Sequence, residues 1–226
     1  MPLKIWLHIF KINKNTKPQI LKDNEKQWTN EYLTALQQPS PVPTHIKYRY
    51  QNSEIKDALE KETHGKCAYC ESKFKHVAFG DIEHILPKNK NARPELYVEW
   101  NNLTLACEVC NRINKKDYYK PSDPLINPIE EEPNEFLIAF GPIIYHIPGS
   151  RKGDLTRNIL DLNRSELIER RKEKIDNLLP LLDKWVNEKN ETYKNLLYSQ
   201  IKQEAEADKE FSFIVKSYLT QIGFFD

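Results

Sequence analysis

Four cysteines lie in two closely spaced pairs, and their spacing is typical of a metal site. Cys67 and Cys70 form one Cys-x-x-Cys pair, and Cys107 and Cys110 form the other. Each pair presents two thiolates from one tight turn, and four thiolates complete the tetrahedral shell of a structural zinc ion. Four cysteines in 226 residues are too few for a disulfide scaffold, and a thioredoxin-like redox site needs only one such pair. We therefore predict a structural Zn²⁺ bound by all four.

The two pairs are separated by 36 residues, more than a simple zinc ribbon needs, so the intervening segment carries structure of its own. Residues 82–85 alternate like a short strand that Pro87 stops, and residues 103–105 alternate like a second strand. Residues 108–116 permit a helix. A strand-strand-helix unit of roughly 50 residues is too small to be stable on core burial alone, so the zinc ion would hold it together.

The motifs of this segment resemble a known family. They run from the first cysteine pair through Glu83-His84-x-x-Pro87-Lys88 to Asn102-Leu103, the second cysteine pair and Asn111. This order resembles the zinc-stabilised HNH nucleases, whose ββα-metal core hydrolyses nucleic-acid phosphodiesters. Scattered further matches, such as 125–128 and 161–164, resemble PtuB, the HNH subunit of Septu-type antiphage systems and their retron-associated relatives.

The resemblance implies a role for each matching residue. His84 would be the general base, a role that suits imidazole because it titrates near neutral pH. Glu83 and Asn111 would bind a catalytic divalent cation, Mg²⁺ or Mn²⁺, with Asp81 as a possible replacement or assistant for Glu83. Asn102 would orient the base histidine. In a regular strand Glu83 and His84 point to opposite faces, so both reach one site only if the strand ends or bulges there.

The chain departs from the family pattern where many relatives have a lysine, three residues after the final asparagine. Here that position is Asn114, followed by Lys115 and Lys116, so the phosphate contact would shift. Lys88, Lys115 and Lys116 are our candidate nucleic-acid contacts. The loop with Lys88, Lys90 and Arg93 fits two interpretations equally well, a set of phosphate contacts or a plain solvated loop. His64 and His76 flank the first cysteine pair and are less favoured alternatives as zinc ligands.

Outside this core, proline divides the chain into two kinds of segment. Eleven of the 14 prolines lie between Pro39 and Pro148, which predicts short elements and loops there, and an extended linker at 38–43. Asn52 or Ser53 caps a short helix that leads to the first cysteine pair. The apolar spacing over 168–186 predicts a helix of about 20 residues, capped by Asn163 or Ser165 and kinked at Pro180, with further helices around 196–201 and 211–222.

The predicted fold class is therefore α+β, with three regions. Residues 1–60 form an N-terminal extension with a short helix, 61–125 form the ββα-metal core, and 126–226 form a mostly helical region that could dock a partner. The net charge of +1 hides an asymmetry, because 1–50 and 61–120 together carry +8 while 121–226 carry −5. This difference suits a basic face towards phosphate, although a chance imbalance on two solvated surfaces explains it as well.

Three functions remain open from the sequence. The first is a metal-dependent HNH endonuclease, the effector of a prokaryotic defence complex with a PtuA-like ATPase and, in retron-associated systems, a reverse transcriptase with its non-coding RNA. The second is a zinc-knuckle adaptor without catalysis, and the third is a stand-alone nuclease toxin. No apolar stretch long enough for a membrane span and no signal-peptide pattern occur, so a cytoplasmic location is expected.

Overall fold

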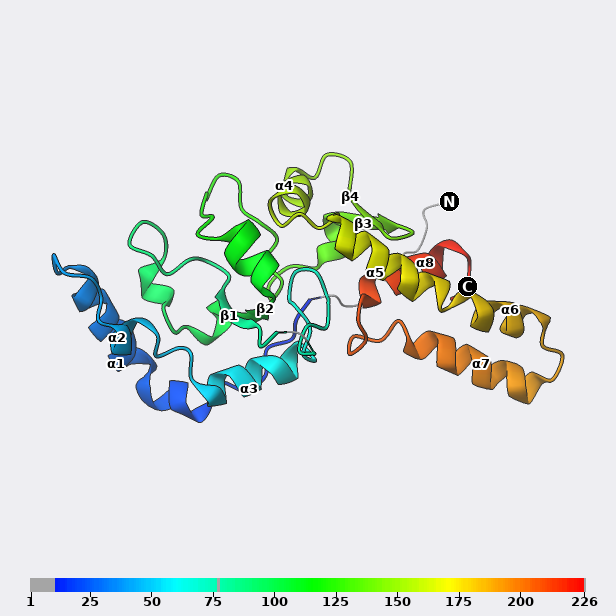
Figure 1. Ribbon diagram of the computed structural model, residues 1–226, viewed down its shortest axis with the longest axis horizontal. Coiled ribbons are helices and arrows are strands. Elements are labelled where there is room, and N and C mark those ends of the chain that lie inside the picture. Colours follow the sequence, from blue (N-terminus) through cyan, green and yellow to red (C-terminus); the bar gives the residue numbers. More distant parts are fainter. Residues whose placement is uncertain (1–10, 77, 226) are drawn as a thin grey trace.

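The computed structural model describes residues 11–76 and 78–225. The molecule is elongated, with helices α1 (Gln19–Leu36) and α2 (Thr44–Lys47) at one end and the pair α6 (Leu179–Asn187) and α7 (Glu191–Gln203) at the other, as Figure 1 shows. Within the described residues, no helix is long and apolar enough to cross a membrane. The expected extension at 1–60 is described from residue 11 onward.

A small strand-strand-helix unit occupies the middle of the molecule. Strand β1 (Asp81–His84) pairs antiparallel with β2 (Leu103–Ala106), in a register that places Glu83 opposite Thr104. The chain then turns through Val109–Lys115, which is a π-helix and not the regular helix that we expected over 108–116. The wider π-helical turn brings Asn111 and Lys115 close to β1, as their contacts below show. The mixed α+β fold class is confirmed.

The N-terminal region packs against this unit through aromatic rings. Helix α1 was not expected, because its sequence has only a weak apolar spacing. In the structure only Leu21 and Tyr32 on this helix are buried. Tyr32 stacks on Tyr97 with ring centroids 4.1 Å apart. Helix α3 (Ser53–Glu62) begins as expected, since the Asn52 side chain accepts a hydrogen bond from the Glu54 amide. It stops before Gly65, whose φ of +68° suits glycine.

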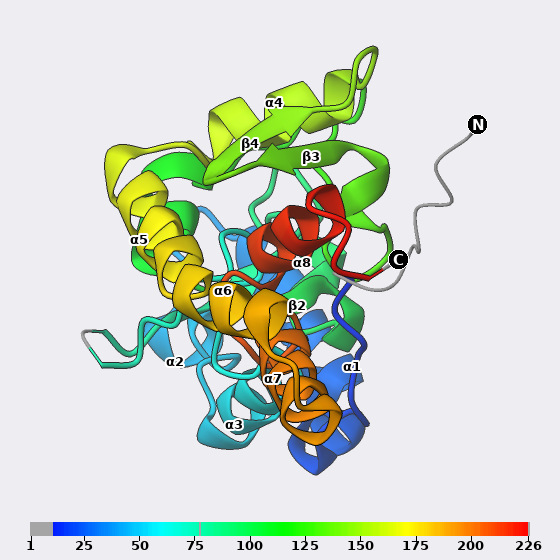
Figure 2. The same ribbon diagram turned by 90° about the vertical axis from the view of Figure 1, so that its right-hand side faces the viewer.

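A second hairpin and a short helix follow the core. Strands β3 (Leu137–Phe140) and β4 (Ile143–His146) pair antiparallel, and α4 (Arg151–Ile159) packs against β4. Helix α8 (Ser212–Gln221) lies against β3, as Figure 2 shows from the end of the molecule. The hairpin therefore follows the β1–β2 unit in the sequence and belongs to residues 126–226, a region that we had expected to be mostly helical.

The single long helix expected over 168–186 is wrong. The chain forms α5 (Ser165–Asp176), breaks at Asn177 and Leu178, and restarts as α6 with Pro180 in its first turn. Proline is tolerated there because the first helical amides have no partner within the helix, so the residue starts a helix instead of kinking one. Arg164 stands at the N-cap position, where we expected Asn163 or Ser165. The other two predicted helices are α7 and α8.

Two hydrophobic clusters hold these elements. The larger one joins residues of the N-terminal helices, the β1–β2 unit and the later chain, including Leu59, Leu105, Leu160 and Phe211. The smaller one lies among α6, α7 and α8 and includes Leu182, Ile201 and Leu219. Because the first cluster contains residues from 21 to 214, the β1–β2 unit is fixed on both sides by the rest of the chain.

Candidate active site and zinc site

The four cysteines meet in the core and form one cluster. Their sulfur atoms lie within 4.8 Å of one another, and all four side chains are buried and unpaired by disulfides. Cys67 and Cys70 come from the loop after α3, Cys107 comes from the turn after β2, and Cys110 lies in the first turn of the π-helix. Four convergent thiol groups at this spacing fit a tetrahedral zinc ion, so the donor set matches the metal that we predicted.

Positive charge lies beside the sulfur atoms. The guanidinium nitrogens of Arg164 lie 3.9 Å from Cys110 Sγ, and Ser72 Oγ lies 3.4 Å from Cys70 Sγ. Four thiolates around Zn²⁺ leave a net charge of −2, which a neighbouring arginine offsets. In the sequence, residues 161–164 stand out only as part of the resemblance to PtuB. Their contact with the zinc ligands could not be found from spacing, since Arg164 is 54 residues away from Cys110.

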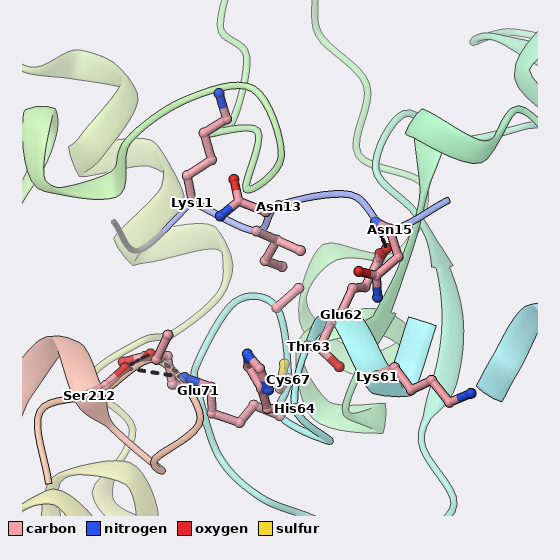
Figure 3. A pocket seen from close by; sticks show the side chains of 14 residues that line it. Lys11, Asn13, Asn15, Lys61, Glu62, Thr63, His64, Cys67, Glu71 and Ser212 are labelled. Atoms are coloured by element: carbon pink, nitrogen blue, oxygen red, sulfur yellow. Dashed lines mark hydrogen bonds and ion pairs between the residues drawn. The ribbon is translucent and has the colours of Figure 1, made fainter. Parts of the chain in front are cut away.

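A pocket next to the first cysteine pair is lined by the N-terminal segment, α3 and the start of α8 (Figure 3). Its acidic groups are already paired. The Glu71 carboxylate accepts hydrogen bonds from Lys66 and from the hydroxyl of Ser212, and Glu62 accepts from the Asn15 amide. Because Glu71 directly follows Cys70, its hydrogen bond with Ser212 joins α8 to the loop that carries Cys67 and Cys70. We interpret this pocket as a structural junction.

A different cavity, of about 90 Å³, collects the candidate catalytic residues, and we call it the site cavity. It opens at the end of β1, beside the π-helix. Glu83 and His84 both line it although they are neighbours in a strand, because β1 ends at His84. The residues lining the site cavity are Tyr50, Ile82, Glu83, His84, Pro87, Lys88, Asn111, Lys116 and Asp117.

The ring of His84 is held in one tautomer. Its Nε2 lies 2.8 Å from the backbone carbonyl oxygen of Tyr97, which can only accept a hydrogen bond, so Nε2 carries the proton. Nδ1 of the neutral ring then has a free lone pair. The ring of Tyr50 meets the histidine edge-on, with centroids 4.6 Å apart. Burial, together with the positive charge of Lys88, lowers the pKa of His84 well below its ordinary value.

Glu83 is a buried carboxylate with a buried lysine as its partner. Lys115 Nζ lies 2.6 Å from Glu83 Oε1, and the Tyr69 hydroxyl donates to the same oxygen at 3.1 Å. Lys115 also donates to the backbone carbonyl of His84 at 2.9 Å. Burial raises the pKa of Glu83, and the charge of Lys115 opposes that rise. Both of these contacts of the carboxylate use Oε1, so Oε2 is the oxygen left for another ligand.

Asn111 lies at the border of the site cavity and is oriented by Asp81. Its amide nitrogen donates to Asp81 Oδ2 at 3.1 Å, which leaves the side-chain oxygen Oδ1 available. Asp81 itself forms an ion pair with Arg112 and lines a separate hollow beside Asn52 and Lys56. Asp81 is therefore not among the residues that line the site cavity; in this structure it orients Asn111, and its part as a metal ligand stays a prediction.

Asn102 makes its side-chain hydrogen bonds to main-chain groups near His84 and not to the histidine ring. Its side chain accepts a hydrogen bond from the Leu86 amide at 2.8 Å and donates to the Leu86 and Leu96 carbonyls at 2.9 and 3.2 Å. Asn102 thus fixes Leu86, two residues after His84, and Leu96, the residue before Tyr97. Asn102 reaches the histidine through its neighbours, and Tyr97 is the direct partner that the motif does not contain.

The three candidate nucleic-acid contacts have different surroundings. Lys115 is only 3% exposed and its ammonium group is paired with Glu83, so in this structure it faces that carboxylate and not the surface, and its contact with nucleic acid stays a prediction. Lys88 and Lys116 line the site cavity, and Lys116 is exposed. Burial lowers the pKa of Lys88 to about 8, and its ammonium lies 3.3 Å from the Tyr50 hydroxyl. His64 and His76 are exposed and lie outside the cysteine cluster.

Comparison with known proteins agrees with the motif. Residues 67–117 match the HNH endonuclease family. The chain is 29% identical over 194 residues to the Septu protein PtuB of Bacillus mycoides (strain KBAB4), covering 72% of this chain and 66% of that protein. It is 34% identical over 112 residues to the Septu protein PtuB of Bacillus thuringiensis, covering 49% and 41%. The matches thus span less than two thirds of each relative. The resemblance to zinc-knuckle HNH nucleases and to PtuB is confirmed.

Proposed function

We propose that this chain, which carries an HNH endonuclease domain, hydrolyses phosphodiester bonds of nucleic acid at the site cavity and acts in antiphage defence. The observation that carries the proposal is the meeting of Glu83, His84 and Asn111 at one cavity, at the end of β1 and beside the π-helix. A base, an oxygen ligand set and nearby lysines are the groups that phosphodiester hydrolysis needs.

In this proposal His84 is the general base. Its Nδ1 takes the proton from the attacking water while the Nε2–H bond to the Tyr97 carbonyl keeps the ring in place. The lowered pKa of His84 keeps the ring neutral and therefore able to accept a proton at neutral pH. Lys88 and Lys116, which line the same cavity, contact the phosphate oxygens.

The residues present fit a catalytic divalent cation. Glu83 Oε2 and Asn111 Oδ1 would hold it, and oxygen ligands of this kind suit Mg²⁺ or Mn²⁺. The ion would neutralise charge on the phosphate and assist departure of the leaving oxygen. Asp81 fixes the orientation of Asn111 and so supports that ligand set from outside.

We also propose that the chain is the effector subunit of a complex with a PtuA-like ATPase in the cytoplasm. The similarity to two Septu PtuB proteins supports the partner, and a retron-associated complex is a narrower version of the same proposal. Docking would use residues 126–226, and the core would be 61–125, as expected from the sequence. The four free thiols suit a reducing compartment.

The test is cleavage of plasmid DNA and of structured RNA by the zinc-loaded chain, alone and together with a PtuA-like ATPase, in Mg²⁺ or Mn²⁺. We expect His84→Ala to lose at least 100-fold in rate, as removal of a general base does. His45→Ala is the matched control, because His45 is exposed and lies outside the site cavity. Equal cleavage by wild type and His84→Ala would overturn the catalytic assignment and favour the adaptor function.

A further inference from the structure

Lys115 occupies an unusual position for a lysine, because it is buried against the carboxylate that the proposed function uses. Its side chain is 3% exposed and that of Glu83 is 5% exposed. The ammonium bridges Glu83 Oε1 at 2.6 Å and the His84 carbonyl at 2.9 Å. A buried ion pair of this kind is costly to form, and removing one partner leaves an uncompensated charge.

The charges around the site cavity nearly cancel even before a metal ion arrives. Glu83 and Asp117 contribute two negative charges to its lining, and Lys88 and Lys116 contribute two positive charges. Lys115 adds a third positive charge in direct contact with Glu83, so the five groups together are formally +1. A divalent cation at Glu83 would be repelled by that ammonium at short range and in a poorly solvated place.

A second cavity, of about 260 Å³, lies next to Lys115 on the side of Tyr69 and Tyr118, and we call it the tyrosine cavity. Lys115 lines the tyrosine cavity but not the site cavity. Glu130, Glu131, Lys120 and Lys152 also line it, and Glu131 is paired with Lys152 at 2.6 Å, so the cavity offers room and the carboxylate of Glu130 for an ammonium group. The lysine therefore has a place into which it can withdraw from Glu83.

From these contacts we propose that Lys115 is a positioning residue that restrains Glu83 and thereby limits divalent-cation binding at the site cavity. This inference rests on the proposed function, because it assumes that Glu83 is a ligand of the catalytic ion. In the resting chain Lys115 holds Glu83 and the His84 backbone. When a divalent cation binds Glu83, the ammonium group moves towards the tyrosine cavity.

The test is binding of Mn²⁺ to the zinc-loaded full chain. Binding is measured as the loss of the electron paramagnetic resonance signal of free Mn²⁺. Lys115→Met and Lys115→Gln remove the charge, and we expect each to bind Mn²⁺ at least fivefold more tightly than wild type. Lys115→Arg keeps the charge and should bind like wild type. Lys22→Met is the matched control, because it removes one charge from an exposed lysine that lines neither the site cavity nor the tyrosine cavity, and we expect a change below twofold.

A purely structural role predicts the opposite sign, since a disordered Glu83 would bind Mn²⁺ more weakly. Unchanged or weaker binding in a Lys115→Met or Lys115→Gln chain that keeps one zinc ion and its circular dichroism spectrum overturns the proposal. Absence of binding in wild type and in both variants also overturns it. The rate of cleavage at saturating Mn²⁺ should fall in both variants. The Mn²⁺ concentration that gives the half-maximal rate should also fall. Tighter binding without cleavage by any chain would reject the proposed function and leave the restraint intact.

Discussion

The Nε2 atom of His84 donates its proton to the backbone carbonyl of Tyr97 at 2.8 Å, so a main-chain group and not a motif side chain fixes the proposed base. Tyr97 is itself fully buried and stacked on Tyr32 of α1. The N-terminal helix therefore supports the site cavity from a distance of 65 residues in the sequence. This support explains why α1 packs on the core although few of its own residues are buried.

Activity should persist at lower pH than an ordinary histidine base would allow. Burial and Lys88 lower the pKa of His84 well below 6.5, so the ring stays neutral as the pH falls through that value. We expect kcat/KM for cleavage to be level from pH 7.5 down to 6.5 and its acid limb to lie lower. The profile is measured at saturating Mg²⁺, and an acid limb centred at or above 6.5 would contradict the assignment.

The lowered pKa of His84 also makes the free energy of unfolding depend on pH. Between the pKa of folded His84 and 6.5, the unfolded chain binds a proton that the folded chain does not. The contribution of His84 to the free energy of unfolding is therefore complete above pH 6.5 and is lost as the pH falls. Urea denaturation of wild type and His84→Gln at pH 7.5 and 5.5 checks this, because the variant should lose less stability between the two values.

Lys88 should set the basic limb of the same profile. Its pKa is lowered to about 8 by burial, so above that pH the residue loses the charge that would contact phosphate. We expect the rate to decline above pH 8 in wild type. Lys88→Arg keeps its charge and should move the decline upward by at least one pH unit. A basic limb that is identical in both chains would show that Lys88 does not contact the phosphate.

Asn102→Ala should lower the free energy of unfolding more than its place at the end of a short 3₁₀ helix (Trp100–Asn102) suggests. The side chain is 4% exposed and makes three hydrogen bonds, to Leu86 twice and to Leu96 once. Leaving these buried main-chain groups without partners should lower the free energy of unfolding by about 3 kcal/mol. Asn101→Ala is the control, because Asn101 is exposed, and it should change stability by less than about 0.5 kcal/mol. Urea denaturation followed by circular dichroism measures both.

Much of the core could be predicted because its signals are local in the sequence. Two Cys-x-x-Cys pairs, the alternation in 82–85 and 103–105, and the cap at Asn52 each need only a few neighbouring residues. The meeting of Glu83 and His84 at one cavity depended on a strand ending near Pro87, and β1 does end at His84.

The rest depends on contacts between distant residues. The burial of Lys115 needs the π-helical turn, which returns it to Glu83 after 32 positions, and no spacing rule predicts that winding. The partner of His84 is a main-chain carbonyl. Every residue has one, so no residue type in the sequence identifies this partner. The β3–β4 hairpin has only four residues in each strand, and its alternation is correspondingly short.

Removing zinc should unfold the core and not merely inactivate it. The four cysteines join the loop after α3 to the turn after β2, and the unit between them is too small to be stable without that link. We expect one zinc ion per chain, and chelation or Cys67→Ser should lower the melting temperature by about 10 °C or more. Elemental analysis and thermal circular dichroism measure the two quantities on the same samples.

His64→Ala is the control for the zinc measurement, because His64 is exposed and lies outside the cysteine cluster. This variant should keep both the metal and the melting temperature. Arg164→Met should keep the fold but release zinc to a chelator faster, since it removes the positive charge 3.9 Å from Cys110 Sγ. A zinc-free chain that melts at the wild-type temperature would show that the cysteine cluster is not structural.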